Sequence, residues 1–269
     1  WFLSSALSID EEDTDAELFN PRYIGIICHR ILERLYQRIR ENDRVFISTH
    51  LADYREWAES IFNETVHSQT DFRGPLAAPF IESIKKRSLK SVDFVLTFDA
   101  EKLDGYTPYL MEGELQHRSG DILYHGLVDR IAYQEAEGRA VIIDYKTGKV
   151  PSATDYTSGA MRDFQMPMYI FLAENRLKQE VLHAFFLGIT KEERRYIVND
   201  KEVIPQGSAR SSKTREEFEP SIQAFLQIAQ EYAQQVGMED FRKPAAVQWQ
   251  DCMGCPFHTI CRTTFTVGE

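Results

Sequence analysis

Two charged residues at the end of an apolar run have the types and spacing needed to hydrolyse a phosphate ester. The run covers residues 141–146, and Asp144 and Lys146 stand two positions apart at its end. Because side chains alternate along a strand, both would project from the same face. A carboxylate in this position could hold a divalent cation. The ammonium group could orient the attacking water or stabilise the charge on a pentavalent phosphate.

A second carboxylate precedes this pair. Asp129 lies in the run Gly-Leu-Val-Asp-Arg at 126–130, and the turn predicted at Glu137-Gly138 would bring it beside Asp144 across a hairpin. Two carboxylates that converge in this way suit a hard cation such as Mg²⁺ or Mn²⁺. An isolated Asp-x-Lys pair is usually two surface charges, so the prediction depends on the apolar strand and on this second acid.

Other polar residues could complete the site. Gln165 and Tyr169 have the i, i+4 spacing of one helix face, although this pair alone would fit core packing and a helix cap equally well. Either Glu112 or Glu114, on the strand before the hairpin, could supply a further acid. The sequence does not distinguish between the two.

Helices and strands must position these residues. Hydrophobic periodicity predicts helices at 24–40, 53–66, 79–98, 156–177 and 215–235. Alternating β-rich runs predict strands at 109–116, 122–133, 140–145, 181–190 and 195–198, the first three forming an antiparallel meander. This order predicts an α/β fold in which helices flank a mixed sheet.

The chain is expected to form one domain over residues 1–269. We predict an N-terminal helix and helical insertion at 24–108, an α/β core at 109–200, and a C-terminal helix with a cysteine-bearing tail at 215–269. A length of 269 residues with 43% hydrophobic content is enough for a full core. The first residue is Trp rather than Met, which suggests a fragment of a longer chain.

Composition restricts the possible functions. The sequence has no apolar stretch of membrane-spanning length, no basic-flanked leader and no phosphate-binding glycine loop, so a cytoplasmic protein without its own nucleotide-driven motor is expected. The net charge of −11 is unusual for a protein that binds nucleic acid. Carboxylates that hold metal ions would account for part of it. The basic stretches at 85–87, 191–195 and 210–215, taken singly, are expected to be solvated faces.

Several motifs, in chain order, resemble those of RecB-like nucleases in the PD-(D/E)XK superfamily. They are Gly-x-x-x-His at 25–29, Gly-Leu-Val-Asp-Arg-Ile at 126–131, Ile-Ile-Asp-Tyr-Lys-Thr-Gly at 142–148 and Gln-x-x-x-Tyr at 165–169. The resemblance covers residues 24–262 and implies a restriction-endonuclease-like fold. It further implies roles for the individual residues: metal binding by His29, Asp129, Asp144 and the Tyr145 carbonyl, catalysis by Lys146, and positioning of DNA or of the lysine by Gln165 and Tyr169.

The C-terminal cysteines extend the resemblance. Cys252, Cys255 and Cys261 are spaced C-x2-C-x5-C, which resembles the end of the iron–sulfur staple in AddB-type nucleases. The resemblance implies a [4Fe–4S] cluster whose fourth cysteine lies upstream of Trp1, with Cys28 a buried helix residue. The cluster would clip the C-terminus to the N-terminal helix. Zinc bound with His258 ranks below the cluster, and free thiols rank below both.

The family resemblance also implies a function. It indicates a Mg²⁺- or Mn²⁺-dependent deoxyribonuclease, an exonuclease on single-stranded or unwound DNA, that serves as the nuclease module of a helicase–nuclease in double-strand break repair. A helicase subunit, or a helicase-like region upstream, would supply unwinding. One alternative is a catalytically inactive nuclease-like scaffold, although every motif acid and the lysine are present. Another alternative, a zinc-stabilised interaction module, would explain only the tail.

Overall fold

A computed structural model describes residues 21–67, 77–156, 161, 163–200, 203–204 and 212–238. Residues Leu18–Ile228 form one compact unit, and Trp1–Glu17 with Ala229–Glu269 form a second. The described part of the second unit, residues 229–238, is the end of helix α5 and the residue that follows it.

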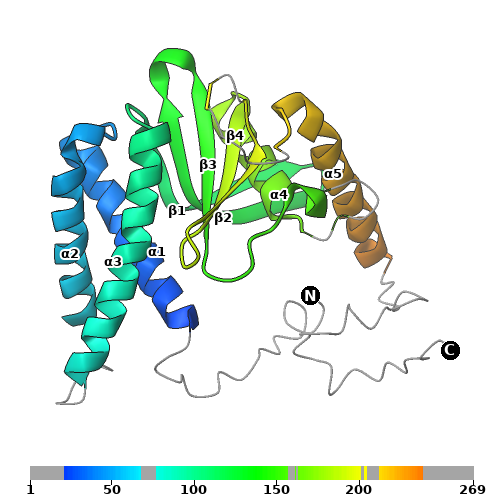
Figure 1. Ribbon diagram of the computed structural model, residues 1–269. Coiled ribbons are helices and arrows are strands. Elements are labelled where there is room, and N and C mark those ends of the chain that lie inside the picture. The colour runs from blue at the N-terminus through cyan, green and yellow to red at the C-terminus, as the bar shows by residue number, and fades with distance from the viewer. Residues whose placement is uncertain are drawn as a thin grey trace, which may run out of the picture. The chain divides into compact units, whose positions relative to one another are not determined.

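The first unit is a five-stranded sheet with helices on both faces (Figure 1). Helices α1 (Pro21–Asn42), α2 (Leu51–His67) and α3 (Ala77–Lys102) pack together on one face, and α4 (Gln165–Leu177) lies on the other. The predicted α/β class and the mixed sheet flanked by helices are therefore confirmed. The three helices before the sheet are also close to their predicted bounds.

The sheet has the order β1-β2-β3-β4-β5. Strands β1 (Thr107–Ser119), β2 (Ile122–Gln134) and β3 (Arg139–Lys146) form the expected antiparallel meander. Strand β4 (Val181–Gly188) lies parallel to β3, and β5 (Glu193–Val198) is antiparallel to β4. A parallel pair needs a crossover connection, and α4 is the helix of that crossover. It therefore lies beside the end of β3, where Asp144 and Lys146 are found.

Helix α4 begins later than the sequence pattern predicted. The expected helix covered 156–177, but only Ala153–Tyr156 forms a short 3-10 turn, and α4 starts at Gln165. Pro167 explains the later start. In the first turn its missing N–H costs nothing, whereas within a longer helix it would break the hydrogen-bond ladder. The Asp163 carboxylate accepts a hydrogen bond of 2.8 Å from the backbone N–H of Gln165, one of the N–H groups that the first turn of the helix leaves unpaired.

Helix α5 (Arg215–Gly237) is anchored through its first turns. The Arg215 guanidinium forms a two-pronged ion pair with Glu174 of α4, at 2.7 and 2.8 Å. The Ser221 hydroxyl donates to the Tyr156 carbonyl at 2.6 Å. These contacts are buried or half-buried, and they hold the start of α5 on the α4 side of the sheet.

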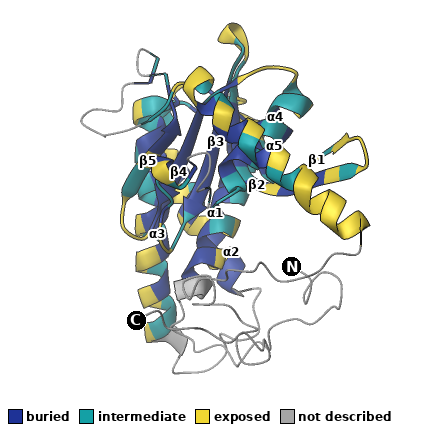
Figure 2. Cartoon of the chain, turned by 90° about the vertical axis from the view of Figure 1, so that its right-hand side faces the viewer, coloured by how far each residue is buried: buried dark blue, intermediate teal, exposed yellow. Residues whose placement is uncertain are grey.

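The buried residues lie along the strands of the sheet and on parts of the helices that cover it (Figure 2). Between the sheet and α1–α3 lie apolar residues of both, among them Ile31, Leu35 and Phe98 from the helices and Ile143 and Phe185 from the strands. Strand β3 is buried along nearly its whole length and ends at the half-buried Lys146. Its continuous apolar run fits a strand covered by helices on both faces.

A charged pair is buried within the α1–α3 layer. The Arg130 guanidinium donates to both Asp99 carboxylate oxygens, at 2.7 and 2.8 Å, and the two side chains are only 1% and 2% exposed. The Tyr36 hydroxyl donates to the same carboxylate at 2.6 Å, and its ring stacks 3.9 Å from the Arg130 guanidinium carbon. Because Arg130 directly follows Asp129, this network fixes the part of β2 that carries the candidate acid.

Candidate active site

Strands β2 and β3 separate where the candidate acids lie. The last pair of their ladder joins Arg130 to Ile143, so Asp129 and Asp144 are one position beyond it. The backbone N–H of Tyr145 donates to the Asp129 carboxylate at 2.7 Å. The side chain of Asp129 thus occupies the opening between the strands, and the predicted approach of Asp129 to β3 is present.

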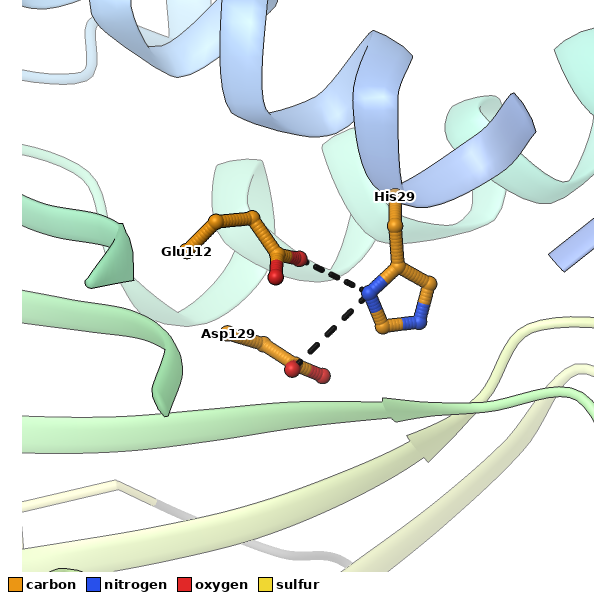
Figure 3. Close-up of side chains that lie close together, drawn as sticks. All are labelled: His29, Glu112 and Asp129. Atoms are coloured by element: carbon orange, nitrogen blue, oxygen red, sulfur yellow. Dashed lines mark hydrogen bonds and ion pairs between the residues drawn. The ribbon is translucent and has the colours of Figure 1, made fainter. Parts of the chain in front are cut away.

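Three ligand-type side chains meet at this opening (Figure 3). The Nδ1 atom of His29 on α1 lies 2.8 Å from Glu112 Oε1 on β1 and 3.8 Å from Asp129 Oδ1 on β2. One ligand atom from each residue lies within 4.8 Å of the others. The other ring nitrogen of His29, Nε2, lies 3.2 Å from the Tyr145 carbonyl. Residues from four elements, α1, β1, β2 and β3, therefore surround the His29 ring.

Only one of the two glutamates considered from the sequence is part of this cluster. Glu112 has a left-handed backbone with φ of 43°, and the β1–β2 pairing passes from Met111–Arg130 to Gly113–Val128 without it. This local irregularity turns its side chain toward His29. The Glu114 side chain is 68% exposed and lies 3.7 Å from His125.

Asp144 and Lys146 form a second network next to this cluster. The Lys146 ammonium lies 2.7 Å from Asp144 Oδ2 and donates to the Gln165 side-chain oxygen at 2.6 Å. The Gln165 amide nitrogen donates to Asp144 Oδ1 at 2.6 Å and to the Tyr169 hydroxyl at 2.9 Å. The Tyr169 hydroxyl in turn donates to the Leu127 carbonyl. Gln165 thus bridges the acid and the lysine, and it shares a helix face with Tyr169 as their spacing predicted.

Burial makes the acids of the site costly to ionise. Burial and the nearby Asp129 charge together raise the pKa of Asp144 to about 7, against the opposing effect of Lys146. Burial also raises the pKa of Asp129, although His29 and the Tyr145 N–H lower it. For His29, burial acts to lower the pKa. The Glu112 hydrogen bond and the charges of Asp129, Glu112 and Asp144 outweigh it and raise the pKa to about 9. The carboxylates of the site therefore favour positive charge beside them, which the proton on His29 supplies without a metal and which a bound cation would supply in its place.

These residues fit a divalent cation. Two carboxylates and one imidazole give an oxygen-rich donor set, and this chemistry suits Mg²⁺ or Mn²⁺. The Tyr145 carbonyl, which the resemblance also implied as a ligand, lies on the other ring nitrogen of His29. In this arrangement Asp144 is held by Lys146 and Gln165, and the cluster is made by His29, Glu112 and Asp129. Sequence reasoning named all of these residues, with Glu112 as one of two choices.

Two glycines allow the flanking helices to approach. A Cβ atom on Gly25 of α1 would lie 2.9 Å from the Thr147 side chain, just after Lys146. A Cβ atom on Gly126 of β2 would lie 3.1–3.2 Å from side chains of α4, including Tyr169. The close approach at Gly25 brings His29, one turn further along α1, to the end of β3.

The cysteines divide into two groups. Cys28 is fully buried in α1, as expected, and burial raises the pKa of its thiol to about 11. Cys252, Cys255, Cys261 and His258, predicted to hold a cluster or zinc, lie outside the described residues.

Comparison with known proteins agrees with this fold. The family model of the PD-(D/E)XK nuclease superfamily matches residues 1–262, and the chain belongs to this superfamily. An uncharacterized protein of Treponema pallidum (strain Nichols) is 34% identical over 76 residues, which are 28% of this chain and 10% of that protein. The chain therefore matches only a small part of that relative. None of the helices among the described residues has the length and apolar character needed to cross a lipid bilayer.

Proposed function

We propose that the chain is a Mg²⁺- or Mn²⁺-dependent deoxyribonuclease of the RecB-like branch of its superfamily, acting on single-stranded or unwound DNA. The observation that carries the proposal is the convergence of His29, Glu112 and Asp129 beside the Asp144–Lys146 pair. These are the parts that phosphodiester hydrolysis needs: ligands for a cation and a positioned ammonium group.

The residues have distinct proposed tasks. A cation bound by His29, Glu112, Asp129 and the Tyr145 carbonyl, joined by Asp144, would polarise the phosphate and lower the pKa of a bound water. Lys146 would orient that water or stabilise charge on the phosphate, since its ammonium group lies at the same strand end. Gln165 would hold both Asp144 and Lys146 in position, and Tyr169 would fix Gln165 through their hydrogen bond.

The direct test is cleavage of end-labelled single-stranded DNA by the purified chain with Mg²⁺, with Mn²⁺ and with a chelator. Products that shorten stepwise from one end would support an exonuclease, whereas internal fragments would indicate an endonuclease. No cleavage with either metal, from a chain extended upstream and correctly folded, would favour the inactive scaffold instead.

We further propose an AddB-type setting in the cytoplasm, in which a helicase subunit or an upstream helicase-like region unwinds DNA during double-strand break repair. The resemblance of the motifs and cysteine spacing supports this setting. The chain alone should then leave a blunt duplex intact and cut a strand that is already unpaired. Equal cutting of both substrates would argue against dependence on a helicase.

The cysteine tail is proposed to hold a [4Fe–4S] cluster through Cys252, Cys255, Cys261 and a cysteine upstream of Trp1. Anaerobic purification of the upstream-extended chain, followed by visible absorption and by iron, sulfide and zinc analysis, tests the proposal. Near four irons and four sulfides per chain would support it. Stoichiometric zinc without iron would favour the alternative with His258.

A further inference from the structure

An open groove of about 440 Å³ lies against the candidate metal ligands. His29 and Glu112 line it on the side of the site, and Thr147 lines it where β3 has ended. Helix α1 supplies the remaining lining side chains, Ile26, Arg30 and Glu33, next to Gly25. The volume is within the usual range for ligand pockets, and the groove opens directly onto the cluster of His29, Glu112 and Asp129.

The exposed side of α1 along this groove has a defined order. Ile26, Arg30 and Glu33 are spaced i, i+4 and i+7, so they follow one helix face. The Ile26 side chain is 48% exposed, whereas Ile27 and Ile31 of the same helix are buried in the core. An exposed isoleucine next to a polar cluster is available for contact with an apolar part of a substrate.

Arg30 differs from other arginines of α1. The Arg34 guanidinium pairs with Glu64, and Arg40 donates to the Tyr109 carbonyl at 3.0 Å. Arg30 is exposed, and no carboxylate within the described ranges forms an ion pair with it. An exposed guanidinium without a carboxylate partner suits a phosphate, which it can bind with two parallel hydrogen bonds.

We propose that this groove binds the single strand of DNA next to the phosphate that is cut, with Arg30 on a backbone phosphate and Ile26 against a base or sugar. The inference rests on the proposed nuclease function and extends it to a positioning surface. Ile26 favours a single strand, because unpaired bases can turn toward an apolar side chain, whereas the bases of a duplex are stacked on one another and paired.

Charge defines the direction in which the strand leaves the site. Glu33 lies one turn beyond Arg30, toward the C-terminus of α1, and its carboxylate accepts a hydrogen bond from Gln37 at 3.2 Å. A carboxylate repels phosphate, so the strand runs from the cluster toward Ile26 and Thr147 rather than past Glu33. Replacing Glu33 with Gln therefore tightens binding, and replacing Arg30 weakens it.

Fluorescence anisotropy tests the proposal. The 269-residue chain carrying Lys146→Ala would be titrated with labelled oligothymidylate and with a blunt duplex, in Mg²⁺ and over a range of salt concentrations. Arg30→Ala should weaken single-strand binding about 5- to 10-fold and reduce the slope of log affinity against log salt by about 0.7, as the loss of one phosphate contact predicts. Arg30→Lys should keep most of the slope.

Two further variants separate this groove from general electrostatics and from folding. Arg87→Ala removes one positive charge, as Arg30→Ala does, but from an exposed position on α3. It should leave the affinity for DNA and the salt slope nearly unchanged. Ile26→Ala should weaken binding of the single strand about 3- to 10-fold and leave binding of the duplex unchanged. Circular dichroism melts of each variant confirm that the fold is kept.

The outcomes distinguish this inference from the proposed function. If Arg30→Ala and Arg87→Ala behave alike, or if Ile26→Ala weakens both substrates equally, the groove does not hold the strand as proposed. The chain with Lys146 intact would still cut DNA in that case, so the nuclease proposal would stand. If that chain cuts no DNA and the Lys146→Ala chain binds none, both proposals are wrong.

Discussion

His29 Nδ1 on helix α1 lies 2.8 Å from Glu112 Oε1 on strand β1, although 83 positions separate the two residues. The contact joins the N-terminal helix to the sheet at the point where Asp129 also projects. The first helix is thus part of the candidate active site as well as a cover for the core.

Loss of Glu112 is expected to weaken metal binding. Glu112→Gln removes one charged ligand, and Mn²⁺ affinity measured by calorimetry should fall roughly 10- to 100-fold. Glu114→Gln is the matched control, because Glu114 is exposed and lies outside the cluster. An equal loss in the two variants would contradict the ligand assignment.

The imidazole should favour Mn²⁺ over Mg²⁺. Nitrogen ligands bind Mn²⁺ more readily than the harder Mg²⁺, which strongly prefers oxygen. His29→Ala is therefore expected to reduce Mn²⁺ affinity more than Mg²⁺ affinity, with both compared by calorimetry. A loss of equal size for both ions would indicate that His29 acts only through its hydrogen bonds to Glu112 and Tyr145.

Metal binding should stabilise the fold more as pH rises. The pKa of Asp144 is raised to about 7 and that of His29 to about 9, so the metal-free fold holds these protons more tightly than the unfolded chain does. The stability that these two protons give the metal-free fold is complete at low pH and is lost as pH rises through the two pKa values. Metal needs the deprotonated ligands. The Mn²⁺-induced rise in Tm should thus be larger near pH 9 than near pH 6, and an equal rise at both would contradict the assignment.

Gln165 is expected to act by positioning. Gln165→Ala breaks the bridge between Asp144 and Lys146 and should lower kcat about 10- to 100-fold, the usual effect of losing a supporting hydrogen bond. Gln165→Glu keeps an oxygen that can accept from Lys146 but loses the N–H group that donates to Asp144. If kcat changes in neither variant while KM rises, Gln165 binds substrate instead.

The buried Asp99–Arg130 pair should matter for stability. Asp99→Asn leaves the buried Arg130 charge uncompensated, which typically costs about 3–5 kcal/mol of unfolding free energy. Glu101 lies on the same helix as Asp99 and forms a more exposed ion pair with Arg194 of β5. Glu101→Gln should therefore cost less than about 1 kcal/mol. Urea unfolding compares the two, and similar losses would contradict the importance of burial.

Regular spacings predicted which candidate residues share a face, whereas the choice of His29 rested on the family resemblance. Asp144 and Lys146 follow the period of a strand, and Gln165 and Tyr169 follow that of a helix, so each pair was assigned to one face. Glu112 could not be chosen over Glu114, because strand alternation assigns both to the same face. The left-handed backbone at Glu112, which separates them, is seen only in the folded chain, where α1 packs against β1.

Two further features depended on contacts between distant residues. Asp99 follows Val95 and Leu96 at helical spacing, which would have indicated its buried face, but its partner Arg130 could be recognised only from the assembled sheet. The late start of α4 had a local signal in Pro167, which hydrophobic periodicity alone did not take into account.

The most direct test of the central claim compares cleavage of end-labelled single-stranded DNA by the unmodified chain, by Asp129→Asn and by Asp144→Asn, in Mn²⁺. The control is Asp121→Asn, the same chemical change at an exposed turn. We predict that the two site variants lose at least about 100-fold in rate while the control cuts normally. Cleavage at the normal rate by folded Asp129→Asn or Asp144→Asn would contradict the account.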